Sequence, residues 1–226
     1  MCGRFTLTAT PEALNLLFPS LFDHLAIEPH YNVAPSQNVL AVRLNPESGN
    51  PEAVRLRWGL VPSWADDLKI GYKLINARVE TASTKPAFRS AFKHRHCLVL
   101  ADGFYEWRKK TDKQPFHIRL KAGRPFAFAG LWERWKQDDK AVESCTILTT
   151  DANAAVQPLH DRMPVILDPA RYQDWLAAGD GAGALDYLLP YPAEEITAVA
   201  VSQHVNSPRN NGPECLTPAS TQTTLF

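Results

Sequence analysis

The chain has 226 residues, of which 45% are hydrophobic and 21% are charged, a composition typical of a globular protein that can bury a substantial core. Its 24 basic and 24 acidic residues give a formal net charge of +0. This balance excludes binding to nucleic acid through overall positive charge, so any such binding must use a local basic site. No apolar run approaches the ~18–20 residues of a membrane span, and no secretory signal is recognisable, so we expect a cytoplasmic protein without a membrane partner.

The first part of the chain predicts one short helix and then strands separated by irregular segments. The sequence Thr10-Pro11-Glu12 combines a cap, a proline and an acid, and predicts a helix that Pro19 ends near Phe18. The proline-rich segment 29–35 predicts no regular structure. Strands are expected at 39–44 and 54–58, an irregular segment at 59–72, and a short helix, broken by Pro86, at 82–92.

The middle of the chain is rich in β-branched and aromatic residues with turn signals between them, which predicts hairpins. Strands are expected at 97–101, 105–108, 116–120, 126–131, 145–149 and 165–167, with hairpin tips at 109–114 and 135–141. Helices at 169–178 and 182–189 and a last strand at 196–201 complete the predicted elements.

The order of these elements indicates the fold class. The strands come in neighbouring runs without strict alternation of strand and helix, which favours the α+β class. We therefore predict a single compact domain around a mainly antiparallel, barrel-like β-sheet with flanking helices. No linker or internal repeat divides the chain. The domain is expected to span 2–217, and 218–226 to form a polar, disordered tail.

The cysteines argue against a disulfide framework and against bound zinc. None of the four is paired at CxxC spacing, and the sequence His94-x-His96-Cys97 has poor spacing for metal ligands. We expect no metal and no cofactor. Cys97 and Cys145 lie in or beside apolar runs and are expected to be buried core thiols. The cysteines are Cys2, Cys97, Cys145 and Cys215.

Cys2 differs from the other cysteines because of its position. Removal of Met1 would leave Cys2 with a free α-amine and a thiol on adjacent carbons. The α-amine titrates near ~7.7–8.0 and the thiol near ~8.5, so both have a reactive fraction at neutral pH. An aldehyde forms an imine with such an amine, and the thiol then closes a thiazolidine ring. Many chains begin with Met-Cys by chance, so this pattern alone assigns no function.

Other stretches carry polar groups suited to chemistry, and each also has an ordinary structural interpretation. Asn76 and Arg78 lie two residues apart and would face the same side of an extended segment. Glu106, between two aromatic residues, is a candidate for proton transfer or a solvent-facing strand residue. His160 precedes a proline-anchored strand and is a candidate functional or simple structural histidine. Trp64, in an irregular loop, could stack on a base or cover the core edge.

Taken together and in order, these stretches resemble one family. The sequences MCGRF, YNVAP, RWGLVPSW, INARVET, ADGFYEW and LHDRMPVIL follow one another between Met1 and Leu167. The chain strongly resembles the SRAP family (SOS-response-associated peptidase, also called the abasic-site processing family), from Cys2 to about Asn211. The resemblance implies a compact α+β fold around an antiparallel barrel-like sheet, in agreement with the strand pattern.

The resemblance also implies a function in DNA damage and the SOS response. Members of the family crosslink covalently to abasic sites in single-stranded DNA through the N-terminal cysteine, which here is Cys2. The same resemblance implies that Glu106, His160 and Asn76 complete the catalytic set, with Asn76 holding the substrate. It further implies hydrolase chemistry that removes Met1, lyase-like chemistry, and reversal of the crosslink. Association with the nucleoid during damage is expected.

The resemblance implies a set of DNA-binding residues as well. The arginines match positions that grip phosphates, a hydroxyl adds one contact, and a tryptophan with a proline forms a wedge against duplex DNA. Ala65 stands where some relatives carry a second tryptophan, which predicts weaker exclusion of duplex. The expected partner is single-stranded DNA with abasic sites, also at single-strand/duplex junctions, bound by a monomer. The set is Arg4, Arg78, Arg162, Thr149, Trp64 and Pro35.

Two other functions remain open from the residues alone. The first is a cysteine peptidase that acts on other proteins, with Cys2 as nucleophile, His160 as base and Glu106 as orienting group. It predicts turnover of peptides and tolerance of a blocked α-amine. The second is a non-catalytic single-stranded DNA-binding protein, which predicts unchanged DNA binding after Cys2→Ala and no covalent adduct.

Overall fold

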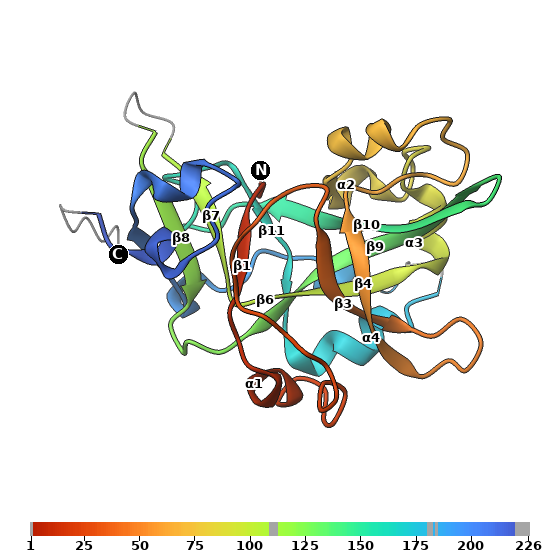
Figure 1. Ribbon diagram of the computed structural model, residues 1–226, viewed down its shortest axis with the longest axis horizontal. Coiled ribbons are helices and arrows are strands. Elements are labelled where there is room, and N and C mark those ends of the chain that lie inside the picture. Colours follow the sequence, from red (N-terminus) through yellow and green to blue (C-terminus); the bar gives the residue numbers. More distant parts are fainter. Residues whose placement is uncertain (1, 109–112, 180–182, 184, 220–226) are drawn as a thin grey trace.

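The computed structural model describes residues 2–108, 113–179, 183 and 185–219. Five strands pair in a ring and close a barrel, in the order β10-β4-β3-β6-β9 and back to β10 (Figure 1). All neighbours are antiparallel except β4 and β10, which are parallel. The barrel strands are β3 (Asn38–Leu44), β4 (Pro51–Trp58), β6 (His96–Ala101), β9 (Phe126–Gln137) and β10 (Lys140–Asp151).

A second, fully antiparallel sheet has the order β13-β8-β7-β1-β2 and carries the N-terminal strand. Both ends of the described chain lie on its side of the molecule (Figure 1). Three short strands extend the barrel: β5 runs parallel to β10, and β11 and β12 run antiparallel to β10 and β9. The bounds are β1 (Phe5–Leu7), β2 (His30–Val33), β5 (Asn76–Arg78), β7 (Gly103–Trp107), β8 (Pro115–Leu120), β11 (Arg162–Pro164), β12 (Ile166–Leu167) and β13 (Ile196–Ala200).

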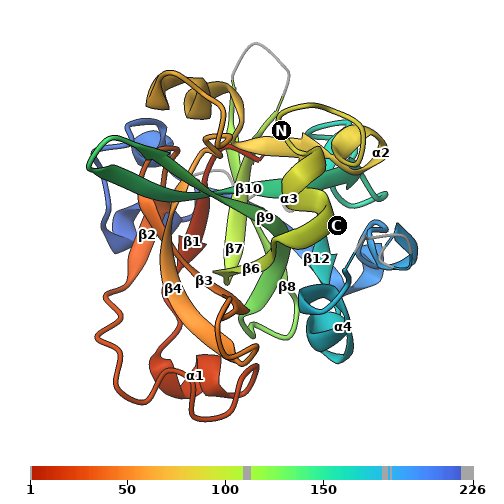
Figure 2. The same ribbon diagram turned by 90° about the vertical axis from the view of Figure 1, so that its right-hand side faces the viewer.

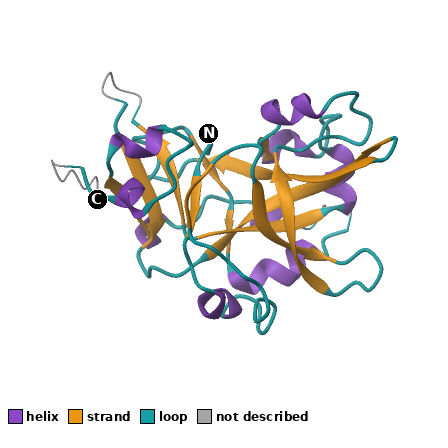
Figure 3. Cartoon of the chain, viewed as in Figure 1, coloured by secondary structure: helices purple, strands orange, loops and turns teal. Residues whose placement is uncertain are grey.

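The helices are short and lie around the strands, as Figures 2 and 3 show. Among the described residues none is long and apolar enough to cross a bilayer. The α-helices are α1 (Pro11–Asn15), α2 (Val79–Ala82), α3 (Arg89–His94) and α4 (Tyr172–Leu176). The 3₁₀-helices are η1 (Leu68–Lys73), η2 (Pro169–Arg171), η3 (Leu185–Tyr187), η4 (Ala193–Glu195), η5 (Gln203–Asn206) and η6 (Pro213–Leu216).

Alternation along the barrel strands divides the apolar core in two. In β3, Val39 and Ala41 pack in one cluster with residues of β1, β7 and β8, whereas Leu40 and Val42 pack in another with residues of the helices. This is the period of two expected for strands buried on both faces. The first cluster includes Cys2, so the N-terminal segment is part of the core between the second sheet and the barrel.

The predicted fold class is confirmed, while several predicted boundaries are wrong. Segment 29–35 contains β2, because a strand paired only with β1 tolerates prolines at its flanks. The first helix ends at Asn15. The predicted tip at 135–141 is mostly strand, with the turn reduced to Asp138 and its neighbour. The predicted tip at 109–114 and helix at 182–189 lie partly outside the described residues.

The first two residues of the predicted tail pair with the chain at the end of β13. Pro218 forms a β-bridge with Val201, and the Ala219 N–H donates to the Ala200 carbonyl at 3.0 Å. Residues 220–226 lie outside the described part of the chain. All four cysteines are free and buried, which confirms the prediction of core thiols for Cys97 and Cys145. Among the described residues no group of three or more His, Cys, Asp or Glu side chains is placed to hold a metal ion.

A buried polar network fixes β1, the strand that follows Cys2. The Thr6 hydroxyl donates to Asp102 Oδ1 at 2.5 Å and lies 3.2 Å from His117 Nε2, which must therefore carry a proton and donate. The Thr8 N–H and hydroxyl both donate to Asp102 Oδ2. An added Cβ at Gly103 would collide with the His117 ring, so only glycine lets this imidazole reach Thr6.

We predict that acid destabilises the fold through two buried histidines. Burial lowers the pKa of His96 and of His117 from 6.5 to about 4. Between those values the unfolded chain binds protons that the folded chain does not, so stability present above pH 6.5 is lost toward pH 4. Urea unfolding at a series of pH values should show this slope, and His96→Phe should flatten it. The exposed control His24→Phe should leave the slope unchanged; an equally steep slope in His96→Phe contradicts the assignment.

Candidate active site

Cys2 lies at the entry to β1 and is 0% exposed. Its carbonyl oxygen accepts a hydrogen bond from Asn76 Nδ2 at 2.7 Å, which joins the N-terminal segment to β5. Its thiol makes a long contact of 3.7 Å to the Arg4 carbonyl. Burial, and then the nearby charge of Glu106, raise the pKa of the Cys2 thiol well above its usual range. The thiol is therefore held in its protonated form at neutral pH.

Glu106 faces the same core as Cys2. The register of β7 pairs Glu106 with Phe116 of β8, whose side chain belongs to the cluster that contains Cys2. The residues on either side, Tyr105 and Trp107, pack in a different cluster on the opposite face. Glu106 is only 4% exposed. A carboxylate in this position is sheltered from solvent and acts electrostatically on the thiol, which is the environment suited to proton transfer.

Asn76 is oriented by parallel pairing with the barrel. β5 pairs with β10 so that Asn76 lies opposite Ile147, and the indole N–H of Trp58 donates to the Ile75 carbonyl at 2.9 Å. While Nδ2 holds the Cys2 carbonyl, the buried Oδ1 has no hydrogen-bond partner among the described residues. A buried acceptor without a partner costs free energy, so Oδ1 favours binding of a ligand that carries a hydrogen-bond donor.

His160 ends the turn between β10 and β11. Its Nδ1 lies 2.9 Å from the Arg162 N–H and 2.9 Å from Asp161 Oδ1. These contacts require different protonation states, because an amide only donates and a carboxylate only accepts. The amide contact selects the neutral ring with the proton on Nε2, whereas protonation of Nδ1 would select Asp161. The neighbouring Leu159 packs in the same large apolar cluster as Cys2.

The predicted phosphate-binding arginines have different surroundings. Arg4 Nη1 donates to Asn32 Oδ1 at 2.9 Å and to the Val205 carbonyl at 3.0 Å, both neutral acceptors. Burial lowers the pKa of Arg4. Arg78 is exposed and stands immediately before α2. Arg162, in contrast, is buried and contacts the carboxylates of Glu80 and Asp151.

The remaining predicted DNA-binding residues are also dispersed. Trp64 is 59% exposed on the loop after β4. Thr149 is fully buried, and its hydroxyl donates to the Ala77 carbonyl at 3.4 Å, which makes it a structural contact in this conformation. Pro35 is half-buried in a loop whose Ser36 N–H donates to the Trp58 carbonyl at 2.7 Å.

A cleft with a volume of about 610 Å³, here named the basic groove, includes Asn76 in its lining. Its rim carries three exposed cations, Lys73, Arg78 and Lys85, and its walls carry apolar and aromatic side chains. Cationic rims with apolar walls are the arrangement that proteins use for a single nucleic-acid strand, whose phosphates and bases they match. The lining residues are Trp64, Lys73, Leu74, Asn76, Arg78, Lys85, Pro86, Ala87 and Phe88.

The wall that bears Lys73 is held by contact between two glycines. A Cβ added at Gly71 would lie 2.6 Å from the Gly59 carbonyl oxygen, and one at Gly59 would lie equally close to the Gly71 oxygen. Gly59 also has a φ of +121°, which other residues rarely adopt. The contact packs η1 against the end of β4 and so sets one side of the basic groove.

The sequence did not indicate that Lys73 and Lys85 line a groove or that carboxylates bind Arg162. The lysines flank the INARVET stretch, and this local basic pattern was an available signal. Their convergence with Trp64 depends on the packing of η1 and α3 around β5, which no spacing in the sequence specifies. The structure brings Cys2, Asn76 and Glu106 together and does not place Pro35 in the lining of the basic groove.

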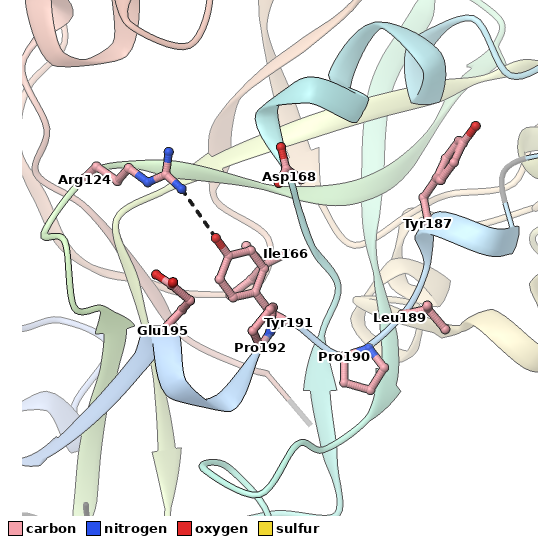
Figure 4. A pocket seen from close by; sticks show the side chains of 9 residues that line it. All are labelled: Arg124, Ile166, Asp168, Tyr187, Leu189, Pro190, Tyr191, Pro192 and Glu195. Atoms are coloured by element: carbon pink, nitrogen blue, oxygen red, sulfur yellow. Dashed lines mark hydrogen bonds between the residues drawn. The ribbon is translucent and has the colours of Figure 1, made fainter.

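A separate pocket of about 330 Å³ lies away from Cys2, between β12 and the segment that precedes β13 (Figure 4). Arg124 Nη2 approaches the Tyr191 hydroxyl at 3.5 Å there, and Asp168 and Glu195 supply opposite charge. It contains none of the predicted catalytic residues. The basic groove, which reaches Asn76, is therefore the better candidate for substrate.

The fold and the site together define a class of barrel protein. In it a buried cysteine near the N-terminus is hydrogen-bonded to an asparagine that lines a groove with a cationic rim. Comparison with known proteins gives the family. The sequence profile described as SOS response associated peptidase (SRAP) matches residues 1–208. The chain belongs to the SRAP family.

The relatives are similar over nearly the whole chain. The abasic site processing protein YoaM of Bacillus subtilis is 45% identical over 225 residues, covering 96% of this chain and 97% of YoaM. The abasic site processing protein YedK of Escherichia coli is 33% identical over 227 residues, covering 96% and 100%. A crystal structure of a protein from Bacteroides thetaiotaomicron has a TM-score of 0.82 at 25% identity, covering 96% and 100%.

We predict that Gly71→Ala displaces the wall of the basic groove. The added methyl meets the Gly59 backbone, which cannot move aside as a flexible side chain can, so unfolding free energy should fall by about 1–3 kcal/mol. Thermal unfolding and binding of undamaged single-stranded DNA measure the two effects. Gly183→Ala is the control, since among the described residues no atom outside its chain neighbours lies within 4 Å of a Cβ there. Wild-type stability and binding in Gly71→Ala would show that the contact is unimportant.

Proposed function

We propose that this protein processes abasic sites by binding single-stranded DNA in the basic groove and capturing the lesion covalently at Cys2. Two relatives carry the name abasic site processing protein, and the chain covers nearly all of each. The observation that carries the proposal is the bond between Asn76 and the Cys2 carbonyl, because it links the Cys2 backbone to a residue that lines the basic groove. Removal of Met1 is part of the proposal, since it creates the Cys2 amine.

The capture reaction balances without a cofactor. The Cys2 amine adds to the C1′ aldehyde of the open abasic sugar and gives a carbinolamine, which loses water to form an imine. The thiol sulfur then adds to the imine carbon, and the thiol proton moves to the nitrogen. The products are a thiazolidine and one water molecule. Only an N-terminal cysteine offers both groups on adjacent carbons.

The electrostatics favour a reaction that begins at the amine. Burial and Glu106 hold the thiol protonated, so it is a poor nucleophile until a base accepts its proton. Imine formation needs no thiolate, and Glu106 is placed to take the thiol proton in the second step. A peptidase that attacks with Cys2 needs a lowered thiol pKa, the opposite of what the site provides.

The other site residues receive matching roles. Neutral His160 carries its proton on Nε2 and can donate a hydrogen bond from it to the sugar oxygen while the ring opens, and again in reversal. Asn76 holds the Cys2 backbone with Nδ2 and offers Oδ1 to the substrate. Self-removal of Met1, reversal of the crosslink and location at the nucleoid stay predictions. So do monomeric action and binding at single-strand/duplex junctions.

Covalent capture is tested with protein that bears a free Cys2 amine and single-stranded DNA with one abasic site. We expect a heat-stable adduct on a denaturing gel, and no adduct with undamaged DNA or with Cys2→Ala. Cys2→Ser should give at most a labile adduct, because an oxazolidine is weaker than a thiazolidine. A permanent N-terminal extension should abolish the band.

Absence of an adduct from protein whose mass confirms loss of Met1 would falsify covalent capture. If Cys2→Ala then binds single-stranded DNA as tightly as the wild-type protein does, the non-catalytic DNA-binding protein is favoured. Hydrolysis of peptides by a form with a blocked amine would favour the peptidase.

The basic groove is tested by removing its lysines. Lys73→Ser with Lys85→Ser should weaken binding of undamaged single-stranded DNA and reduce the slope of log affinity against log salt by about 1.4, or about 0.7 per contact. The control double variant, Lys121→Ser with Lys140→Ser, removes the same charge at two exposed positions, the turn after β8 and the first residue of β10. Equal salt slopes in the two double variants would place the strand outside this groove.

A further inference from the structure

We propose that a pocket on the second sheet binds a free α-amino acid with an aliphatic side chain. The pocket has a volume of about 380 Å³ and is here named the β8 pocket, because β8 supplies two of its polar residues. Its polar lining consists of Thr8, Asp102, His117 and Arg119. None of the predicted catalytic residues lines it, so the proposal goes beyond the proposed function and does not depend on it.

The β8 pocket lies on the face of the second sheet that is turned away from Cys2. Phe116 of β8 packs in the cluster that contains Cys2, and side chains alternate along a strand. His117 and Arg119 therefore share the opposite face, where both line the pocket. Val199 of β13, the cross-strand partner of His117, also lines it. A ligand bound here would touch the back of the sheet whose front packs against Cys2.

One part of the β8 pocket offers acceptors for hydrogen bonds. His117 Nε2 carries a proton and faces Thr6, so Nδ1 is an acceptor, and no described residue donates to it. Asp102 Oδ1 accepts one bond, from the Thr6 hydroxyl at 2.5 Å, and keeps a second lone pair. Burial lowers the pKa of His117 to about 4, so at neutral pH the ring adds no positive charge. These acceptors match an ammonium group, which has only donors and a positive charge.

A second part of the β8 pocket carries a cation. Arg119 is exposed, and none of the described carboxylates forms an ion pair with it. Asp102 acts to raise the pKa of His117 and Arg119 acts to lower it, so the ring is within electrostatic reach of a negative and a positive group. A guanidinium binds a carboxylate through two parallel hydrogen bonds, so Arg119 fits a ligand that carries a carboxylate.

Apolar side chains form most of the remaining lining, namely Val199, Val201, Leu216 and Pro218. Val201 is buried and Leu216 is partly buried, and both pack in the cluster of Tyr105. This wall favours an aliphatic group, which gains free energy on leaving water. An α-amino acid carries an ammonium, a carboxylate and a side chain on one carbon. In a peptide the two charged groups lie at opposite ends, so a free amino acid matches the pocket better.

The acceptors of the β8 pocket are fixed before a ligand arrives. Asp102 Oδ2 accepts hydrogen bonds from the N–H and the hydroxyl of Thr8. Gly103 leaves room for the His117 ring, with which an added Cβ would collide. Groups that are already ordered lose little entropy on binding, which favours affinity. Of the polar residues, only the exposed Arg119 has to be ordered by the ligand.

Calorimetric titration of the full chain with L-leucine and three analogues tests the proposal. L-Leucinamide lacks the carboxylate, isocaproate lacks the ammonium, and glycine lacks the side chain. We expect L-leucine to bind, and each analogue to bind at least about 10-fold more weakly, because each loses one of the matched contacts. L-Leucinamide also represents the first residue of a peptide, and isocaproate represents a simple carboxylate.

Variants locate the binding. Arg119→Gln should weaken binding of L-leucine about 10-fold and remove its advantage over leucinamide, because the carboxylate then has no cation to bind. The control Arg134→Gln removes an exposed arginine of β9 outside the pocket and should bind both compounds as the wild-type protein does. In ¹⁵N spectra of histidine-labelled protein, L-leucine should shift the Nδ1 signal of His117, which His117→Phe identifies.

The outcomes decide between a free amino acid and other ligands. Equal binding of L-leucine and leucinamide would assign the pocket to the first residue of a peptide, and equal binding of L-leucine and isocaproate to a simple carboxylate; either result overturns the proposal. So does absence of binding at millimolar L-leucine, an unchanged His117 signal, or equal affinities in Arg119→Gln and Arg134→Gln. These titrations contain no DNA, so failure of covalent capture would leave their interpretation unchanged.

Discussion

The site depends on the pairing of one three-residue strand. β1 lies between β2 and β7, and its register sets Cys2 against the core while Asn76 holds the Cys2 carbonyl from the barrel side. The network of Thr6, Asp102 and His117 supports this strand from its other face. Residues near a chain terminus are ordinarily poorly ordered unless they are tied down, and these contacts hold Cys2 in the core. Every proposed step of the chemistry assumes that constraint.

The same packing gives the two nucleophilic groups of a processed Cys2 different reactivity. The thiol is buried and close to a carboxylate, so it stays protonated until a base acts on it. Removal of Met1 would create the amine on the residue whose carbonyl Asn76 holds. Opposite charges are separated in space: the cations of the basic groove are exposed, and the carboxylates of Glu80 and Asp151 pair with Arg162. A chain with no net charge can thus present a local positive surface.

Sequence patterns predicted those parts of the fold that local physics determines. The barrel strands were found because alternation and β-branched residues mark long strands with two buried faces. β1 and β2 were not found, since strands of three and four residues hold too little pattern and depend on their partners. The predicted catalytic residues came from the ordered motifs. The ion pairs of Arg162 and the position of the lysines in the basic groove could not be predicted, because the residues involved come from segments that only the tertiary structure brings together.

The complete burial of Cys2 has a consequence for selectivity among cellular electrophiles. Free aminothiols react with any small aldehyde or alkylating metabolite that diffuses to them. Here the side chain is 0% exposed, so a competing molecule must displace packed side chains without compensation. Under the proposed function, a DNA strand gains binding energy along the basic groove and can use it to reach the same atoms. The burial of Cys2 would then favour reaction with a ligand large enough to bind before it reacts.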